Sequence, residues 1–278
     1  GFQAEVGIRV SFSSRGLGVV YKSQVRGLMN DAHVLGIDIG GSSVKGAIID
    51  VSIGAMVTDR LEFPHQPLPN LSSLVDSINK VRRQSGYNGD QAGIGFPGVV
   101  AGTSILNGPN IGSEVRGTTL SESINGLGLE NTLLNDADAA LYHAIRNTDV
   151  CRGHDTALMI TIGTSIGTAL SQGGRLIRNI ELGRVRDEKG NRLDENASQK
   201  ARLTNDMSDD HWAMQLSKAI RHISLLTSPD IVLLSGGVTE SPGGWFDKLE
   251  AAADLVIAPG SNKAGIIGSA CWHHDSKK

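Results

Sequence analysis

The sequence predicts an α/β protein built of two similar halves with a cleft between them. Apolar stretches with the two-residue period of strands alternate along the chain with stretches that have the spacing of an amphipathic helix. A glycine-rich hairpin also occurs twice, at Val34–Asp50 and around Thr161–Thr168, and each follows an apolar strand. We place the boundary between the halves near Glu130, and a cleft between two domains is a favoured position for a ligand.

In the N-terminal half, short strands surround one clear helix. The helix has apolar residues at spacings of 3, 1, 3 and 3, and a connector with three prolines precedes it. A hairpin-like segment with a turn near Gly54 follows the first two strands. We expect strands at 35–39, 44–49 and 91–100 and the helix at 71–83.

In the C-terminal half, helices are longer and a charged stretch interrupts them. We expect strands at 131–134, 156–162 and 231–234, and helices at 136–145, 212–226, 245–253 and 264–272. The last helix is expected to end in a frayed terminus from His273 onward. The charged stretch at 184–202 is interpreted as a solvated loop, with the alternative that its basic residues steer a long polyanion.

The composition limits the class of protein. The 278 residues carry a net charge of −3, which argues against a general nucleic-acid-binding protein because such proteins have a basic face. The two cysteines, Cys151 and Cys271, are too few for a disulfide framework or a cysteine-rich zinc site, so we expect a cytoplasmic protein without zinc. No apolar stretch approaches the length of a membrane span, and we expect neither a membrane nor a nucleic acid as partner.

The first 28 residues differ from the rest. They carry four basic residues and a single acidic one, as an organellar transit segment does. An equally good account is that Met29 is the natural start and that upstream sequence precedes it, and we prefer this account. We therefore expect a disordered leader or upstream extension at 1–28, an N-terminal α/β domain at 29–130 and a C-terminal α/β domain at 131–278.

The first hairpin has the residues of an anion site at its tip. Gly40 and Gly41 leave backbone N–H groups unhindered, and N–H groups in a tight turn form an anion-binding concavity. Two hydroxyls and a cation, Lys45, follow, and the carboxylate of Asp38 ends the first strand. This arrangement favours a phosphate with a divalent ion nearby, whereas the simpler alternative is a glycine-rich turn without a ligand.

The second hairpin repeats this chemistry. Gly163 and Gly167 flank Thr164 and Ser165, so hydroxyls and free amides again meet at one tip. Two such turns are stronger evidence than one, because a polyanion can be held from both sides. Neither turn has the GxxxxGK pattern of a P-loop nor a GxGxxG that opens a helix, which disfavours the corresponding nucleotide-binding folds.

Asn135 and Asp136 lie where a strand ends and a helix begins. Asn and Asp are good N-cap residues, so the pair can be structural. The alternative is that Asp136 points into the cleft as a general base, which phosphoryl transfer to a hydroxyl requires.

Taken in order, these motifs resemble the ROK family of sugar kinases, and within it the bacterial polyphosphate glucokinases. The resemblance extends from about 33 to 270 and rests on the motifs DIGGSSVKGA, FPGVV, NDADAA, TIGTSIGTAL, RNIELG, ENAS, LSGGV and NKAGIIGSA. It implies an actin-like, hexokinase-type (ribonuclease H-like) fold of two α/β domains around a central cleft. It also implies a homodimer that phosphorylates the 6-hydroxyl of glucose or a related hexose with polyphosphate, ATP or both, in the presence of Mg²⁺.

The resemblance assigns roles to individual residues. Asp136 matches the base that deprotonates the sugar 6-hydroxyl, and Asp38 matches the carboxylate near the Mg²⁺-associated phosphate. The residues that match sugar contacts are Asn110, Asn135, Glu181 and Arg184. The residues that match phosphate contacts are Asp38, Gly40, Gly41, Ser42, Lys45, Gly163, Thr164, Ser165, Gly167, Gly236 and Gly237.

Two residues depart from the family pattern. Arg184 stands where the family has a histidine that touches the sugar, so it is expected to pair with Glu181, to accept an anionic or differently substituted sugar, or to weaken the enzyme. Ser165 replaces a glycine, which is costly if φ is positive there. These departures keep open a second hypothesis, a catalytically weakened sugar-binding relative.

Overall fold

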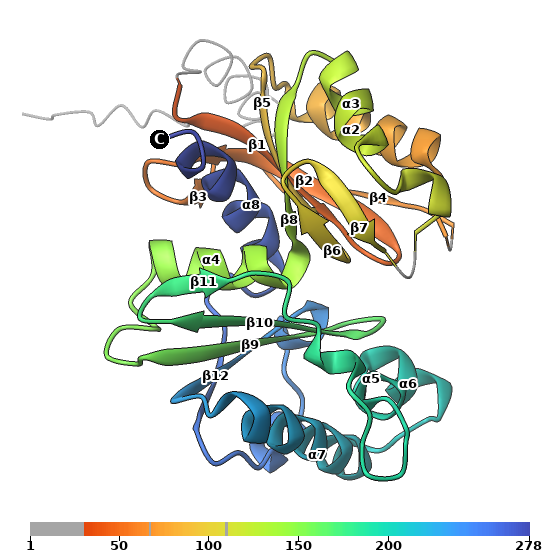
Figure 1. Ribbon diagram of the computed structural model, residues 1–278, viewed down its shortest axis with the longest axis vertical. Coiled ribbons are helices and arrows are strands. Elements are labelled where there is room, and N and C mark those ends of the chain that lie inside the picture. The colour runs from red at the N-terminus through yellow and green to blue at the C-terminus, as the bar shows by residue number, and fades with distance from the viewer. Residues whose placement is uncertain (1–30, 67, 109–110) are drawn as a thin grey trace, which may run out of the picture. The chain divides into compact units, whose positions relative to one another are not determined.

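The computed structural model describes residues 31–66, 68–108 and 111–278, and residues 32–278 form one compact unit. The unit contains two large mixed β-sheets, in each of which antiparallel strands on one side are followed by parallel strands on the other (Figure 1). The leader at 1–28 and Asn110 lie outside the described residues. Among the helices that the structure describes, none combines the length and the apolar character that crossing a bilayer requires.

The first sheet is built on the first predicted hairpin. β1 (His33–Ile39) pairs antiparallel with β2 (Ser43–Asp50), with Ile39 opposite Val44, and β1 then pairs in parallel with the next strand. The strands lie in the order β3-β2-β1-β5-β8, with β4 also on β2. Helices α2 and α3 lie on one side of the sheet and α8 on the other (Figure 1). The bounds are β3 (Ala55–Met56), β4 (Leu61–Pro64), β5 (Gln91–Phe96), β8 (Glu130–Asn135), α2 (Leu71–Ser85), α3 (Thr119–Gly126) and α8 (Ala264–Asp275).

The second sheet repeats this plan with the second predicted hairpin. β9 (Thr156–Ile162) and β10 (Ile166–Gln172) are antiparallel, and β12 and β13 continue the sheet in parallel in the order β11-β10-β9-β12-β13. The other bounds are β11 (Arg175–Ile177), β12 (Ile231–Ser235), β13 (Asp254–Ile257), α4 (Asp136–Asn147), α5 (Leu193–Ala197), α6 (Gln199–Thr204) and α7 (Asp209–Thr227), and a separate hairpin joins β6 (Val99–Ala101) to β7 (Ser104–Asn107).

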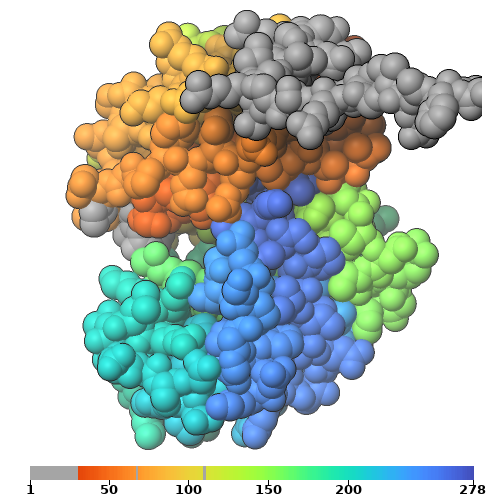
Figure 2. Space-filling model, turned by 180° about the vertical axis from the view of Figure 1, so that it is seen from behind, coloured from red at the N-terminus to blue at the C-terminus, as the bar shows by residue number. Residues whose placement is uncertain are grey.

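Helix α8 packs against both the first sheet and α4. Its backbone approaches so closely that a Cβ added to Gly93 of β5 would collide with Ser269, and one added to Gly268 would collide with Ala139 of α4. The Ser269 hydroxyl donates to the carbonyl of Ile37 at 3.1 Å. In Figure 2, the dark-blue C-terminal residues accordingly extend up to the orange residues of the first sheet.

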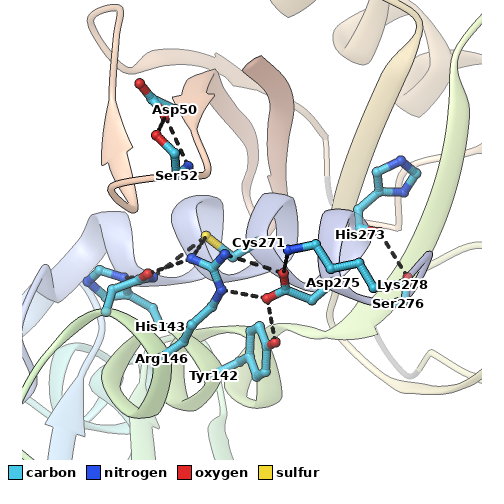
Figure 3. A network of polar contacts seen from close by, with 11 residues as sticks. Asp50, Ser52, Tyr142, His143, Arg146, Cys271, His273, Asp275, Ser276 and Lys278 are labelled. Atoms are coloured by element: carbon cyan, nitrogen blue, oxygen red, sulfur yellow. Dashed lines mark hydrogen bonds and ion pairs between the residues drawn. The ribbon is translucent and has the colours of Figure 1, made fainter. Parts of the chain in front are cut away.

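Polar contacts also join α4 to α8 (Figure 3). Arg146 forms an ion pair with Asp275, and the Tyr142 hydroxyl donates to the same carboxylate at 2.8 Å. Arg146 also reaches the sulfur of Cys271 at 3.4 Å. These contacts hold α4 against α8, which itself packs on the first sheet.

Several expectations about the C-terminal half are wrong. The last helix does not fray at His273, because this side chain is fully buried and lies 2.8 Å from the Gln91 side chain. The segment 245–253 is not an α-helix: only 246–248 form a 3₁₀ turn, because Trp245 is buried against Trp212 with ring centres 4.7 Å apart. The stretch 184–202 is not all loop, since it contains α5 and the start of α6.

The expected boundary at Glu130 falls at the start of a strand of the first sheet. β8 pairs in parallel with β5, with Glu130 opposite Gln91 and Asn135 opposite Phe96. Residues 131–135 thus belong to a strand of the first sheet, and α8 packs on that sheet. The sequence analysis had assigned both segments to the C-terminal half.

Candidate active site

The two hairpin tips line one cavity of about 350 Å³. The cavity lies where strands of both sheets end, so it takes residues from segments far apart in the sequence. Nearly all the predicted site residues meet there: Asp38, Gly40, Gly41, Ser42, Lys45, Asp136, Gly163, Thr164, Ser165, Gly167, Glu181, Arg184, Gly236 and Gly237. Of the other two, Asn135 is buried directly behind the cavity wall, and Asn110 is outside the described residues.

The first hairpin tip is a tight turn that faces the second. The Gly40 N–H donates to the Ser43 carbonyl at 2.8 Å. A Cβ on Gly41 would lie 3.1 Å from the Thr164 hydroxyl, which shows how closely the two tips approach. His65, which the sequence analysis did not single out, lies with its Nε2 3.0 Å from the Gly40 carbonyl and so supports the turn from behind.

The carboxylate and the cation of this hairpin lie on neighbouring strands. The Lys45 ammonium is 3.9 Å from Asp38 Oδ2, because the two residues are directly opposite each other in the β1–β2 ladder. Burial raises the pKa of Asp38, and Lys45 opposes this effect. Asp38 therefore lies in a position where a further cation would be favourable.

The second hairpin tip is held by buried polar contacts. The φ of Ser165 is not positive, so the serine causes no backbone strain in place of the family's glycine. Its hydroxyl donates to the buried carboxylate of Asp194, which also accepts from Arg192 Nε at 3.0 Å. At Gly167, in contrast, a Cβ would collide with the Thr161 hydroxyl, so this position requires glycine.

The sequence left open whether Asn135 and Asp136 cap a helix or point into the cleft, and in the structure each residue takes one of these roles. The Asn135 side chain caps α4 by accepting from the backbone N–H groups of Ala137 and Asp138, at 2.9 and 3.1 Å. Asp136 lines the cavity instead. Burial, with the negative charges of Asp38 and Glu181, raises the pKa of Asp136 to about 8. A carboxylate with this pKa is suited to accept a proton near neutral pH.

The remaining wall carries groups that suit a polyhydroxylated ligand. Asn135 Nδ2 donates to Glu181 Oε1 and to the Gly98 carbonyl, both at 3.0 Å. Arg184 Nε lies 4.0 Å from Glu181 Oε2, so the expected Arg184–Glu181 pair is present. Burial raises the pKa of Glu181, and Arg184 opposes this shift.

A second cavity of about 410 Å³ adjoins the first. Thr164, Ser165 and Arg184 line both. Lys200 and Arg192 add cations to the second, together with the carboxylates of Asp194 and Glu195, which pair with Arg192. Within the described part of the chain, the Lys200 ammonium forms no ion pair, and its backbone N–H donates to Gly163 at 3.4 Å. Part of the charged stretch therefore borders the site.

Comparisons with known proteins agree with this geometry. The model of the ROK family matches residues 34–185. A polyphosphate glucokinase of Mycobacterium tuberculosis is 30% identical over 254 residues, which cover 89% of this chain and 94% of the relative.

Solved structures show the same fold. The crystal structure of an inorganic polyphosphate/ATP-glucomannokinase from Arthrobacter sp. strain KM superposes with a TM-score of 0.82 at 28% identity, over 89% of this chain and all of the other. A ROK family glucokinase from Streptomyces griseus, in complex with glucose and AMPPNP, has a TM-score of 0.73 at 21% identity over 87% of this chain and 99% of the other. The expected actin-like, hexokinase-type fold is thereby confirmed. With two matching hairpin tips, a carboxylate at the start of α4 and this likeness over most of its length, the chain belongs to the ROK family.

Proposed function

We propose that this protein is a hexose kinase, a phosphotransferase that moves a terminal phosphoryl group from polyphosphate or ATP to the 6-hydroxyl of glucose or a related hexose. The observation that carries the proposal is the position of Asp136, whose carboxylate lines the same cavity as both hairpin tips. The names of the relatives, polyphosphate glucokinase and polyphosphate/ATP-glucomannokinase, support the donor and the acceptor class.

In this proposal Asp136 accepts the proton of the sugar hydroxyl as that oxygen attacks the terminal phosphorus. The bond from this phosphorus to the bridging oxygen of the donor breaks, and the remaining donor leaves with one phosphate fewer. The backbone amide of Gly41 and the cation of Lys45 stabilise the charge on the transferred group, whereas the amides of Gly40 and Gly163 hold the two turns by donating to the carbonyls of Ser43 and Ser165. General base catalysis of this kind accounts for about 10²–10⁴-fold in rate.

The sugar is held by the polar wall of the cavity. We assign sugar contacts to Glu181 and Arg184, and to Asn110 from the resemblance, whereas Asn135 lies behind the wall and acts on the sugar through Glu181. The carboxylate of Glu181 accepts from sugar hydroxyls, and the Asn135 amide fixes its orientation. Gly236 and Gly237 border the donor side of the same cavity.

We further propose that Asp38 holds Mg²⁺ through water. Burial raises the pKa of Asp38, which a nearby cation would lower, and a carboxylate is the type of ligand that Mg²⁺ accepts together with substrate phosphates. Bound Mg²⁺ supplies positive charge that offsets the charge of the donor phosphates. Lys45 acts against the raised pKa of Asp38 and so favours its ionised form for this role.

The adjoining cavity suggests a path for a long donor. We propose that phosphates beyond those in the first cavity extend past Gly163 toward Lys200 and Arg192. ATP has only three phosphates, whereas polyphosphate continues beyond them, so we propose that this second cavity distinguishes the two donors.

We also propose a homodimer in the cytoplasm with two domains, one around each sheet. The two free cysteines, Cys151 and Cys271, support a reducing setting. In the domain division, 131–135 and α8 are assigned to the domain of the first sheet because they pack there. Size-exclusion chromatography with light scattering measures the oligomeric state directly.

The decisive experiment is product formation from a panel of hexoses with ATP and with polyphosphate. Asp136→Asn is expected to lower kcat by at least about 10²-fold while glucose still binds in calorimetry, because only the base is lost. Asp59→Asn, at an exposed position, is the matched control and should keep parental activity. If Asp136→Asn keeps parental turnover, the base is assigned wrongly; if the parent binds glucose but forms no product, the weakened sugar-binding alternative is correct.

A further inference from the structure

Asp138 is a fully buried carboxylate that the proposed chemistry does not use. It lies in the first turn of α4, two residues after Asp136, and is 0% exposed. Its Oδ2 accepts from the backbone N–H of Asn179 at 2.8 Å, while its Oδ1 has no hydrogen-bond partner among the described residues. Burying a carboxylate is costly, so its retention two residues from the base calls for a physical reason.

The partner of Asp138 adopts an unusual conformation. Asn179 has a φ of +64°, a left-handed value that is uncommon for residues with a side chain, although Asn tolerates it better than most. Its side chain accepts from the Val100 N–H at 3.0 Å and donates to the Val100 carbonyl at 2.9 Å. Asn179 is thus fixed by α4 through its backbone and by β6 through its side chain.

These contacts are part of a closed series of hydrogen bonds that begins and ends at α4, and Glu181 lies beside it. Asn135, at the start of α4, donates to the carbonyl of Gly98, two residues before Val100. The series therefore runs from α4 to β6, from β6 to Asn179 and from Asn179 back to α4 through Asp138. Glu181 lies two residues beyond Asn179 and is itself bound by Asn135.

We infer that Asp138 is a positioning residue for the sugar pocket: by holding the Asn179 amide, it fixes the segment 179–181 and aims the Glu181 carboxylate into the cavity. The inference rests on the proposed function, because it takes Glu181 as a sugar contact. Asp138 does not line the cavity itself, so it acts through Asn179, which leads along the chain to Glu181 and not to the hairpin tips. Its loss should therefore affect the acceptor sugar and spare the donor.

Asp138→Ala removes the acceptor of the Asn179 N–H and is expected to raise the KM for glucose roughly tenfold or more, the size of one lost hydrogen bond to a charged group. The KM for ATP should change by no more than about twofold, which is well below the change expected from the loss of one such hydrogen bond. Asp138→Asn keeps an acceptor oxygen for the Asn179 N–H, so it should restore most of the glucose affinity.

Asn131→Ala is the matched control. Asn131 is also buried, also has a side-chain oxygen without a partner, and lies in β8 at the end away from the cavity. It should lower stability without changing the KM for glucose. Asn179→Gly, in which glycine tolerates the positive φ and keeps the N–H to Asp138, serves as a second test if Asp138→Ala does not fold, and it should raise the KM for glucose through the loss of both Val100 bonds.

Equal changes in the KM for glucose and for ATP, or a parental KM for glucose in Asp138→Ala and Asn179→Gly, would overturn the inference. So would a failure of Asp138→Asn to recover glucose affinity, since that places the effect in the charge rather than in the hydrogen bond. A parent without kinase activity or glucose binding instead contradicts the proposed function, so the two failures are distinguishable.

Discussion

Single residues set the protonation state of the site. Asp136 lies with two other carboxylates, Asp38 and Glu181, around one partly buried space, where Lys45 and Arg60 offset the charge of Asp38 and Arg184 that of Glu181. The cost of placing several negative charges together is a base that is partly protonated at neutral pH. A substrate or cation that adds positive charge would lower the pKa of Asp136.

The first prediction concerns the pH dependence of catalysis. Because Asp136 must be ionised to accept a proton and its pKa in the free protein is raised to about 8, kcat/KM should increase with pH and level off above about 8. Glu181→Gln removes a negative neighbour, so it should move this acid limb to lower pH. Steady-state kinetics from pH 6 to 9 measure both, and a profile without an acid limb in this range contradicts the role of Asp136.

The second prediction concerns the departure at Ser165. Ser165→Gly restores the family's residue, but it relieves no strain because φ is not positive, and it removes the hydrogen bond to buried Asp194. We expect no gain in kcat and a loss of about 1 kcal/mol in the free energy of unfolding. Chemical denaturation with parallel kinetics measures the two effects, and a several-fold gain in kcat would show that the serine does weaken the enzyme.

At this scale, the sequence predicted residues with a local signature and missed those with distant partners. The hairpin residues and Asp136 were found because glycines, hydroxyls and a carboxylate follow apolar strands. Asp138 and Asp194 had no such signature, because their partners lie 41 and 29 residues away in the chain. Two acidic residues in a helix are usually exposed, and only the fold shows that these two are buried.

Among the elements, the α4–α8 pair carries two neutral histidines in its interior. His143 is 6% exposed and His273 is 0% exposed. Burial lowers the pKa of each to about 4. Neither ring therefore takes up a proton in the folded protein until the pH is far below the value at which the unfolded chain does so.

The third prediction follows from this pair. The unfolded chain binds more protons than the folded one between pH 6.5 and about 4, so the free energy of unfolding should fall as the pH decreases through this window. The loss is at most roughly 3 kcal/mol for each histidine. His143→Gln with His273→Gln should flatten the slope, whereas exposed His211→Gln should not. Denaturant unfolding at several pH values measures the slope, and an unchanged slope in the double variant contradicts this cause.

The strands and helices with strong periodicity were predicted well, and those determined by tertiary packing were not. Both hairpins, α2 and α7 agree with the sequence because their apolar spacing is regular. The segment after Trp245 has helical spacing, but the packing of its indole against Trp212 leaves only one 3₁₀ turn. The boundary was expected near Glu130, before β8, whereas β8 pairs with β5 of the first sheet, since no local feature reveals which sheet a parallel strand will join.

At the scale of the whole molecule, two adjoining cavities offer different sets of contacts to the two proposed donors. The first contains every described residue that we assign to the reaction itself, and the second adds Lys200 and Arg192 beyond Gly163. The second matters only for a donor long enough to reach it.

The fourth prediction tests this path. Lys200→Ala should raise the KM for long-chain polyphosphate several-fold, because it removes a cation without an ion pair next to the second tip, and should leave the KM for ATP unchanged. Lys189→Ala, at an exposed position of the same segment, is the control for general charge. Kinetics with polyphosphates of graded length measure the effect, and equal changes for ATP and all chain lengths would show that the second cavity is not part of the path.

The packing of α8 on the first sheet also affects the order in which the protein can fold. The Ser269–Ile37 hydrogen bond joins residues 232 positions apart, and α8 covers strands that are synthesised long before it. A nascent chain therefore leaves the apolar face of β1 and β5 uncovered until almost all of the described chain has been made. Contacts of such long sequence separation slow folding, and the exposed face is a surface for aggregation or for a chaperone until α8 arrives.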